Sequence, residues 1–208
     1  ASGSFWFFGG YGYAEATFGS LNDLWKWDGT SWTWVSGSKA ADQNGVRGTM
    51  GVGAPGNVPG SRGGSVSWTD TSGNFWLFGG SLYFGNNFDI YSNELWKWDG
   101  TNWTWVRGSN EQDSIFGEKG VPAPGNTPGA RTNAVSWIDA SGNLWLFGGE
   151  MFDCGVWDCY GGYFNDLWRW DGANWAWMGG SQGWSEPGTY GTKGVAAPEN
   201  VPGGRGDS

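Results

Sequence analysis

Two cysteines are the side chains most able to form a covalent link in this chain, and no histidine accompanies them. Cys154 and Cys159 lie five residues apart with a glycine between them, a spacing that could close a small disulfide ring. Without histidine there is no imidazole to act as a catalytic base, and the cysteines cannot complete a usual Cys/His zinc site. The sequence therefore favours a disulfide over free thiols, and it predicts neither a metal site nor a cofactor.

Carboxylates recur at equivalent places along the chain, in turns and just before apolar segments. They are Asp28, Asp99 and Asp171 in the turns, and Asp23, Glu94 and Asp166 before the segments. Because they repeat, we expect local hydrogen bonds from these side chains to the backbone. A glycosidase would need two non-equivalent carboxylates about 5 to 9.5 Å apart across a cleft, and no such pair stands out. We predict no catalytic residue and expect that the chain is not an enzyme.

The elements that hold these side chains must be β-strands. The chain has 208 residues with 41 Gly and 19 Trp, a composition that disfavours long helices and gives too much ring surface for disorder. A net charge of −9 offers no attraction to phosphates, so nucleic acid is not expected as a partner. No apolar run approaches the roughly 18 residues needed to cross a bilayer, so no membrane span is predicted.

One unit of about 70 residues repeats along the chain. An apolar block that ends in Gly-Gly occupies 2–10, 72–80 and 141–149. A block reading Leu-Trp-Lys/Arg-Trp-Asp-Gly and then Trp-x-Trp follows in every copy, and Pro-Gly-x-Arg closes it. The predicted units are 1–61, 62–130 and 131–204, with 205–208 beginning another strand.

Each complete unit is expected to hold four short strands. Strand a covers 64–69 and 133–138, strand b 5–9, 75–79 and 144–148, strand c 23–27, 94–98 and 166–170, and strand d 32–36, 103–107 and 175–178. Strand b is apolar at successive positions, which is typical of burial on both faces. Strands c and d alternate, with two tryptophans on one face of each. We therefore predict that b is an inner strand and that c and d lie further out.

The turn from c to d fixes how these strands pair. One antiparallel register matches Trp27 with Trp32 and also Trp25 with Trp34, and cross-strand aromatic pairs contribute roughly 0.2 to 1 kcal/mol each. The same register is available in the other two units. Packing between sheets is the favoured explanation for these tryptophans, ahead of a ligand-binding stripe.

These residues resemble the kelch repeat, in which an apolar strand ending in Gly-Gly precedes an aromatic strand and a further tryptophan. The resemblance covers nearly the whole chain and implies an all-β fold, with 1–208 forming a single propeller segment of about three four-stranded blades. It implies strand b near the axis and strand d outermost. The unit of about 70 residues is longer than the usual kelch period of about 50.

Such blades also occur in the galactose oxidase family, which is the alternative for function. That resemblance implies histidine and tyrosine copper ligands and a Tyr-Cys cross-link, a set that a chain without histidine cannot supply. The catalytic residues would then have to lie outside this chain. A repeat unit of a surface filament or adhesin is a further alternative.

About three blades fall short of the four to eight that bring the first and last sheets of a propeller together. Two apolar blade faces would otherwise be open to water. We therefore expect either additional blades from further sequence or self-association, in which two copies join head to tail into a six-bladed ring.

The connections from b to c, at 11–22, 81–93 and 150–165, are long and carry aromatic residues. Long loops in a compact domain often bind ligands, and rings on them suit sugar faces or protein surfaces. The candidate ligand-binding residues are Tyr11, Tyr13, Tyr83, Phe84, Tyr91, Trp157, Tyr160 and Tyr163. Packing of these rings over their own loops is an equally open interpretation. We expect a non-catalytic extracellular or cell-surface module that binds glycans or proteins or serves a structural role.

Overall fold

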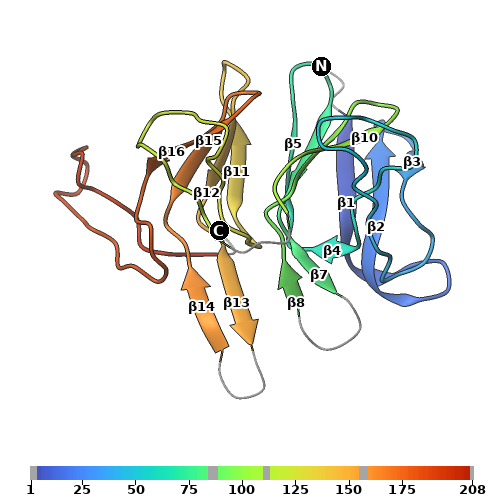
Figure 1. Ribbon diagram of the computed structural model, residues 1–208, viewed down its shortest axis with the longest axis horizontal. Coiled ribbons are helices and arrows are strands. Elements are labelled where there is room, and N and C mark those ends of the chain that lie inside the picture. Colours follow the sequence, from blue (N-terminus) through green and yellow to red (C-terminus); the bar gives the residue numbers. More distant parts are fainter. Residues whose placement is uncertain (1–3, 84–88, 110–112, 155–158, 207–208) are drawn as a thin grey trace.

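The protein is all-β, as the composition predicts. The computed structural model describes residues 4–83, 89–109, 113–154 and 159–206, which contain strands and no helix. Accordingly, none of these residues belongs to a helical segment long and apolar enough to cross a membrane. Figure 1 shows the strands grouped into several small sheets that stand next to one another along the molecule.

Three of the sheets hold the repeated strands, each in the order of the chain. The first is β1 (Phe5–Tyr13), β2 (Phe18–Trp27) and β3 (Trp32–Ser36). The second is β5 (Val66–Thr69), β6 (Phe75–Phe78), β9 (Leu95–Trp98) and β10 (Trp103–Arg107). The third is β11 (Val135–Ile138), β12 (Leu144–Phe147), β15 (Leu167–Trp170) and β16 (Trp175–Gly179). All neighbours are antiparallel, so each sheet is a simple meander.

Two smaller sheets form around the hairpins inserted between strands b and c of the second and third units, and one of them is joined by a short strand that precedes strand a. One consists of β4 (Arg62–Gly63), β7 (Ser81–Tyr83) and β8 (Asp89–Tyr91), and the other of β13 (Glu150–Cys154) and β14 (Cys159–Tyr163). In the first unit β1 and β2 simply continue past the sheet as one long hairpin. The connections expected to be long loops are therefore largely β-hairpins, which project from the same side of the molecule (Figure 1).

The predicted tryptophan register is confirmed. Trp27 is opposite Trp32 and Trp25 is opposite Trp34, and the same pairing recurs between β9 and β10 and between β15 and β16. The turn is held by Asp28, whose Oδ1 accepts hydrogen bonds from the backbone N–H groups of Thr30 and Ser31 at 2.8 and 2.9 Å. Asp99 and Asp171 make equivalent bonds, so local side-chain to backbone bonding is confirmed for these three aspartates.

The order of strands within each sheet corrects the expectation that strand b lies near the axis. Strand b is buried on both faces, since β6 has four buried residues, but it lies inside its sheet between β5 and β9. The strand that comes closest to the neighbouring sheet is strand a, because the edge strands β5 and β11 lie side by side (Figure 1). Successive apolar residues in strand b therefore indicate burial on both faces, and they do not indicate that this strand forms the inner edge of its sheet.

The core lies between the faces of successive sheets. Leu24 and Phe8 of the first sheet pack against Phe75, Trp96 and Trp103 of the second. A second cluster joins the second and third sheets, and Trp76, Phe78, Leu146, Trp168 and Trp175 are among its members. Six of the repeated tryptophans are buried: Trp96, Trp98, Trp103, Trp168, Trp170 and Trp175. Packing between sheets is thus confirmed as the role of these six.

The a to b turns are built on a second aspartate. Asp139 accepts hydrogen bonds from the backbone of Ser141 and Asn143, from the Asn143 amide at 2.8 Å, and from the Trp145 indole N–H at 2.8 Å. The side-chain bonds from Asn143 and Trp145 lower the pKa of Asp139 from 3.8 to about 2. Asp70 holds the equivalent turn in the second unit.

Two glycines on either side of β10 allow a test of how closely the chain packs after strand d. Gly108 has a φ of +81° and its missing side chain leaves room for the Asn93 carbonyl. Gly100 has a φ of +98° with nothing within 4 Å. We expect Gly100→Ala to lower the free energy of unfolding by about 1 to 2 kcal/mol through backbone strain alone. Gly108→Ala should cost about 1 to 3 kcal/mol more, because it adds a clash. Chemical denaturation of both variants gives the comparison, and equal losses would contradict the close contact.

Candidate functional site

A buried arginine pairs with a carboxylate in the second and third units. Arg62 donates from Nη2 to Glu94 at 2.6 Å, and both side chains are at most 3% exposed. Arg131 makes two bonds to Asp166, at 2.5 and 2.8 Å, and this pair is at most 1% exposed. Glu94 and Asp166 directly precede β9 and β15, so strand c positions each carboxylate.

The backbone around each arginine completes its hydrogen bonding. Arg62 donates from Nε to the Gly60 carbonyl and from Nη1 to the Gly79 carbonyl, both at 3.0 Å. Arg131 bonds the carbonyls of Gly129 and Gly148 at 3.0 and 2.9 Å. Each guanidinium is thus enclosed by the turn before it, the Gly-Gly end of strand b and the start of strand c.

An indole completes each cluster. The Trp96 Nε1–H donates to Glu94 at 3.0 Å, and the Trp168 Nε1–H donates to Asp166 at 2.7 Å. Local backbone bonding was expected of Glu94 and Asp166, and the structure corrects this, since arginine and indole are their side-chain partners. The sequence signal for these pairs is the Pro-Gly-x-Arg block, which recurs with the same period as the carboxylates.

The charge state of Glu94 follows from these contacts. Burial alone would raise the pKa of its carboxyl group, but the Arg62 guanidinium, the Trp96 indole and Arg47 outweigh burial and hold the pKa below its ordinary value of 4.5. Arg47 reaches the same carboxylate from the loop that follows the first sheet. Glu94 is therefore ionised at neutral pH and serves as an anchor for two cations.

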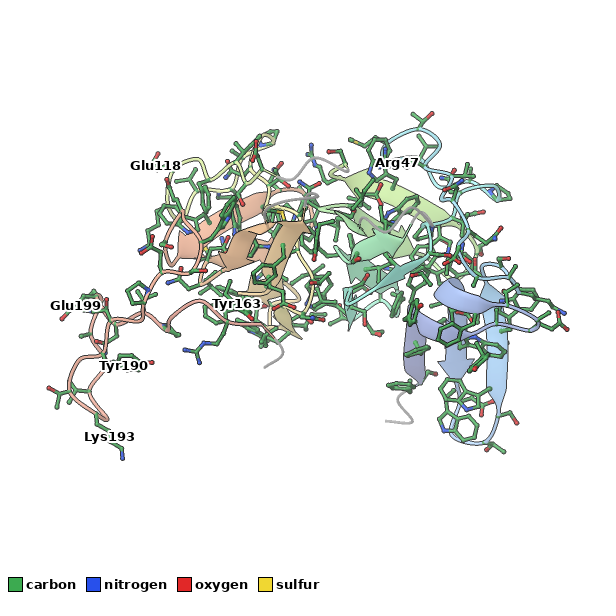
Figure 2. The ribbon with its side chains drawn as sticks, turned by 90° about the horizontal axis from the view of Figure 1, so that it is seen from below. Arg47, Glu118, Tyr163, Tyr190, Lys193 and Glu199 are labelled. Carbon is green, nitrogen blue, oxygen red and sulfur yellow. The ribbon has the colours of Figure 1, made fainter. Side chains whose placement is uncertain are left out.

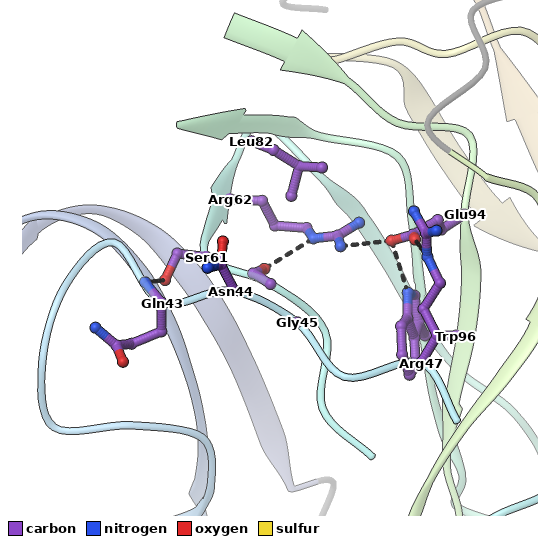
Figure 3. Close-up of a pocket in the computed structure, with 10 residues that line it drawn as sticks. Gln43, Asn44, Gly45, Arg47, Ser61, Arg62, Leu82, Glu94 and Trp96 are labelled. Carbon is purple, nitrogen blue, oxygen red and sulfur yellow. Dashed lines mark hydrogen bonds and ion pairs between the residues drawn. The ribbon is translucent and has the colours of Figure 1, made fainter. Parts of the chain in front are cut away.

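A pocket of about 400 Å³ opens beside this cluster (Figure 3). Arg47, Arg62, Glu94 and Trp96 form part of its wall, with Gln43 and Ser61 on the opposite side. The charged groups in the wall already bond to one another, and the Ser61 hydroxyl accepts a hydrogen bond from the Gln43 backbone at 2.8 Å. This arrangement favours a structural role for the pocket, because its wall pairs no nucleophile with a base.

Three exposed aromatic residues gather near the tip of the β1–β2 hairpin. Tyr11, Tyr13 and Phe18 are 66, 84 and 52% exposed. Both tyrosine rings contact the phenylalanine ring, with centroids 5.0 and 4.7 Å apart. We call these three residues the hairpin ring group. In the third unit Tyr163 is 40% exposed and packs edge-on against Phe152 at 5.4 Å.

The other candidate binding residues are not all available. Tyr91 is buried and packs with Ala130, Met151 and Phe164, so its ring is a core element and not a surface contact. Tyr83 and Tyr160 lie in strands β7 and β14. Phe84 and Trp157 lie outside the described residues. The structure therefore brings together Tyr11 and Tyr13, with Phe18 between them, and places Tyr163 on a separate hairpin.

The two cysteines are directly opposite each other in the β13–β14 hairpin. Residues opposite in an antiparallel pair have Cα atoms about 4.5 to 5.5 Å apart, within the range of about 4.4 to 6.8 Å seen in disulfides. The backbone register of Cys154 and Cys159 thus suits the predicted bond, which stays a prediction. Across the part of the chain that the structure describes, no three Cys, Asp or Glu residues are grouped so as to hold a metal ion.

Comparison with known proteins adds little to this description. The sequence matches no protein-family model. It also matches no curated protein. Among solved structures it is similar to one described as "Structure of YjhT", with 16% sequence identity and a TM-score of 0.38 over 91% of this chain and 70% of that chain. A likeness at that level carries no weight for fold or function.

The buried pair in the third unit predicts a strong effect of removing one partner. Arg131→Met leaves Asp166 buried without its cation, which should cost about 3 to 5 kcal/mol of unfolding free energy. The double variant Arg131→Met with Asp166→Leu should recover part of that loss. Arg107→Met, at a partly exposed arginine with bonds of 3.3 Å, should change stability by no more than about 0.5 kcal/mol. Urea denaturation measures all three, and a single variant no weaker than the control would contradict the pairing.

Glu94 predicts a particular acid dependence. Because folding lowers the pKa of its carboxyl group below 4.5, its stabilising effect is present above that value and is lost as the pH falls through the folded-state pKa. We expect Glu94→Gln to be less stable than the parent at pH 6 and to lose less stability between pH 6 and 3. Glu118→Gln, at an exposed site, serves as the control and should keep the parental slope.

Proposed function

We propose that this chain is a non-catalytic binding module, an arc of three kelch-like propeller blades whose hairpins present aromatic rings to ligands outside the cell. Glycans are the ligand class that the rings favour, and a protein surface is the second class. The hairpin ring group is the observation that carries this proposal.

The arrangement of the sheets supports the propeller arc. Each of the second and third sheets is a four-stranded meander, and successive sheets meet face to face across an aromatic core. Strand a of one sheet lies beside strand a of the next, as expected for blades arranged around a common axis. The hairpins then project from one side of the arc, where one ligand could contact more than one of them.

The chemistry of the rings supports a glycan. Tyr11 and Tyr13 combine exposed ring faces with hydroxyl tips, so they can cover the apolar face of a sugar and still bond its hydroxyl groups. Phe18 holds the two tyrosines by edge and tilted contacts, which reduces the ordering that binding would require. The net charge of −9 disfavours acidic glycans. Neutral glycans are therefore the proposed class.

The state of the carboxylates supports a non-catalytic role. A glycosidase general acid needs a pKa raised toward the working pH. Here the pKa is instead lowered at Asp28, Asp70, Asp99, Asp139 and Glu94. Each of these groups is ionised and already accepts hydrogen bonds from its own turn or from an arginine and an indole.

The ring group is tested by removing its central ring. Phe18→Ala takes away the contact that orients both tyrosines, so we expect at least a tenfold loss of affinity for neutral glycans on an array, followed by titration of the best ligand. Trp137→Ala removes a ring of similar exposure, 41%, from β11 in the third sheet and should leave affinity within twofold.

Two results would contradict the proposal. Either an array without any neutral glycan ligand or glycan binding that is equally strong in Phe18→Ala would exclude the hairpin ring group as a glycan site. Preference for sulfated over neutral glycans would contradict the charge argument. Circular dichroism on both variants confirms that the sheets are intact.

A further inference from the structure

The loop between one sheet and the next docks on the outer strand of the following sheet. Gly51 and Ala54 donate from their backbone N–H groups to the carbonyls of Trp105 and Trp103 in β10, at 2.8 and 3.4 Å. The Asn57 amide donates to the Trp103 carbonyl at 3.0 Å. The loop 46–57 thus covers β10 as an additional edge.

The next loop repeats this contact on the third sheet. Gly120 and Ala123 donate to the carbonyls of Trp177 and Trp175 in β16, at 2.7 and 3.3 Å, and the Asn126 amide donates to Trp175 at 3.1 Å. The Phe116 ring lies 5.3 Å from Trp168 and 5.4 Å from Trp177. Backbone bonds and ring contacts therefore dock this loop together.

A third loop, 189–201, has the same internal structure but covers no described strand. Thr189 and Val201 form a bridge equivalent to those in the other two loops. The Asn200 amide donates to the Val195 carbonyl at 3.1 Å, as Asn57 and Asn126 do to their equivalents. Tyr190, at the position of Phe116, is 83% exposed. Figure 2 shows Tyr190, Lys193 and Glu199 on a loop that extends away from the sheets.

Across the ranges that the structure describes, the first sheet lacks the loop that covers the outer strand of the other two sheets. Among the described residues, no loop lies along its outer strand β3 as the other loops lie along β10 and β16. Trp32 is 52% exposed, whereas its equivalents Trp103 and Trp175 are 0 and 1% exposed. Trp34 is 41% exposed, whereas its equivalents Trp105 and Trp177 are half-buried. These two tryptophans differ from their equivalents in what covers the strand, not in residue type.

The arginine that follows the third loop and the carboxylate of the first sheet both lack, among the described residues, the ion pair seen in the second and third units. Arg205 bonds the Gly203 carbonyl at 3.0 Å, as Arg62 and Arg131 bond theirs, but it forms no ion pair with a carboxylate in the described part of the chain. Asp23 accepts the Trp25 indole N–H at 2.6 Å. Its other carboxylate oxygen is buried and has no partner.

A pocket of about 400 Å³ lies at this carboxylate. Asp23, Trp25 and Trp34 line it. Their equivalents in the second unit are Glu94, Trp96 and Trp105. There Arg62 bonds Glu94, and Arg47 lies over the Trp105 ring. The exposed pair Lys39 and Glu15, 3.6 Å apart, stands at its edge. The space that arginine fills in the second unit is therefore open in the first.

We propose that loop 189–201 and Arg205 of one copy dock on β3 and Asp23 of a second copy, head to tail. Arg205 would pair with the unpartnered oxygen of Asp23, and Tyr190 would pack on Trp25 and Trp34. Loop 189–201 and β1 to β3 lie at opposite ends of the molecule (Figure 2), so one copy cannot make this contact with itself. Two such contacts would close a ring of two copies.

Sedimentation velocity across a concentration series tests the contact. The 208-residue chain should associate, and Arg205→Asp and Tyr190→Ala should each weaken association at least tenfold, because both side chains are exposed in their own copy and would lie in the proposed contact. Asp23→Arg should have the same effect. An equimolar mixture of Asp23→Arg and Arg205→Asp should restore association, since one interface keeps the original pair and the other holds the pair with its charges exchanged.

Glu199→Lys is the matched control. Position 199 corresponds to Gly56 and Gly125 in the docked loops, and a Cβ atom at either position would have nothing within 4 Å. This change reverses a charge on the same loop and should leave association within twofold. A chain that stays monomeric at every concentration, or association that Arg205→Asp and Tyr190→Ala do not weaken, overturns the proposal. Near-ultraviolet circular dichroism of each variant confirms its folded state.

Discussion

The second sheet is joined to the third through Arg131, whose carbonyl accepts a hydrogen bond from the second unit and whose guanidinium donates within the third. The Arg131 side chain belongs to the third unit, where it bonds Asp166, while its carbonyl oxygen accepts the N–H of Gly80 in the second unit at 2.9 Å. A side chain on Gly79 would stand 2.6 Å from that oxygen, and its φ of +73° also requires glycine. The Gly-Gly pair that ends every strand b is therefore the position where the following unit attaches.

This attachment explains why tryptophans at equivalent positions of the repeat differ in their exposure to solvent. Trp32 and Trp103 occupy the same place in their repeats and form the same cross-strand pair, yet one is half exposed and the other fully buried. Burial of Trp103 depends on the loop that arrives from the preceding unit and on Phe8 of the first sheet, 5.6 Å away. A tryptophan in this fold is thus covered by its neighbours and not by its own sheet.

The local elements could be predicted from the sequence, and the contacts between units could not. Strand positions and the Trp27 to Trp32 register follow from alternation and one short turn. The sequence predicts loops where the hairpins β7–β8 and β13–β14 lie, because the glycine, aromatic and acidic residues there show no clear period of two. The pairing of Arg62 with Glu94 spans 32 residues, and only the equal repetition of both residues in each unit indicated it. The sequence predicts strand b near the axis, whereas strand a comes closest to the neighbouring sheet, because burial on both faces does not specify which edge of a sheet lies inward.

The charged pair inside each unit fixes the segment through which that unit contacts the preceding one. The aromatic faces of the three units are nearly equivalent, so apolar packing alone would distinguish poorly between a correct contact and one shifted along the strands. A buried arginine without its carboxylate costs several kcal/mol, so bonding within the third unit fixes the position of Arg131, whose carbonyl oxygen accepts the N–H of Gly80 in the second unit. The indole N–H that reaches the same carboxylate adds an orientation requirement. By the same reasoning the buried Asp23 oxygen that lacks a donor destabilises the first sheet, and a cation bonded to that oxygen would remove this cost.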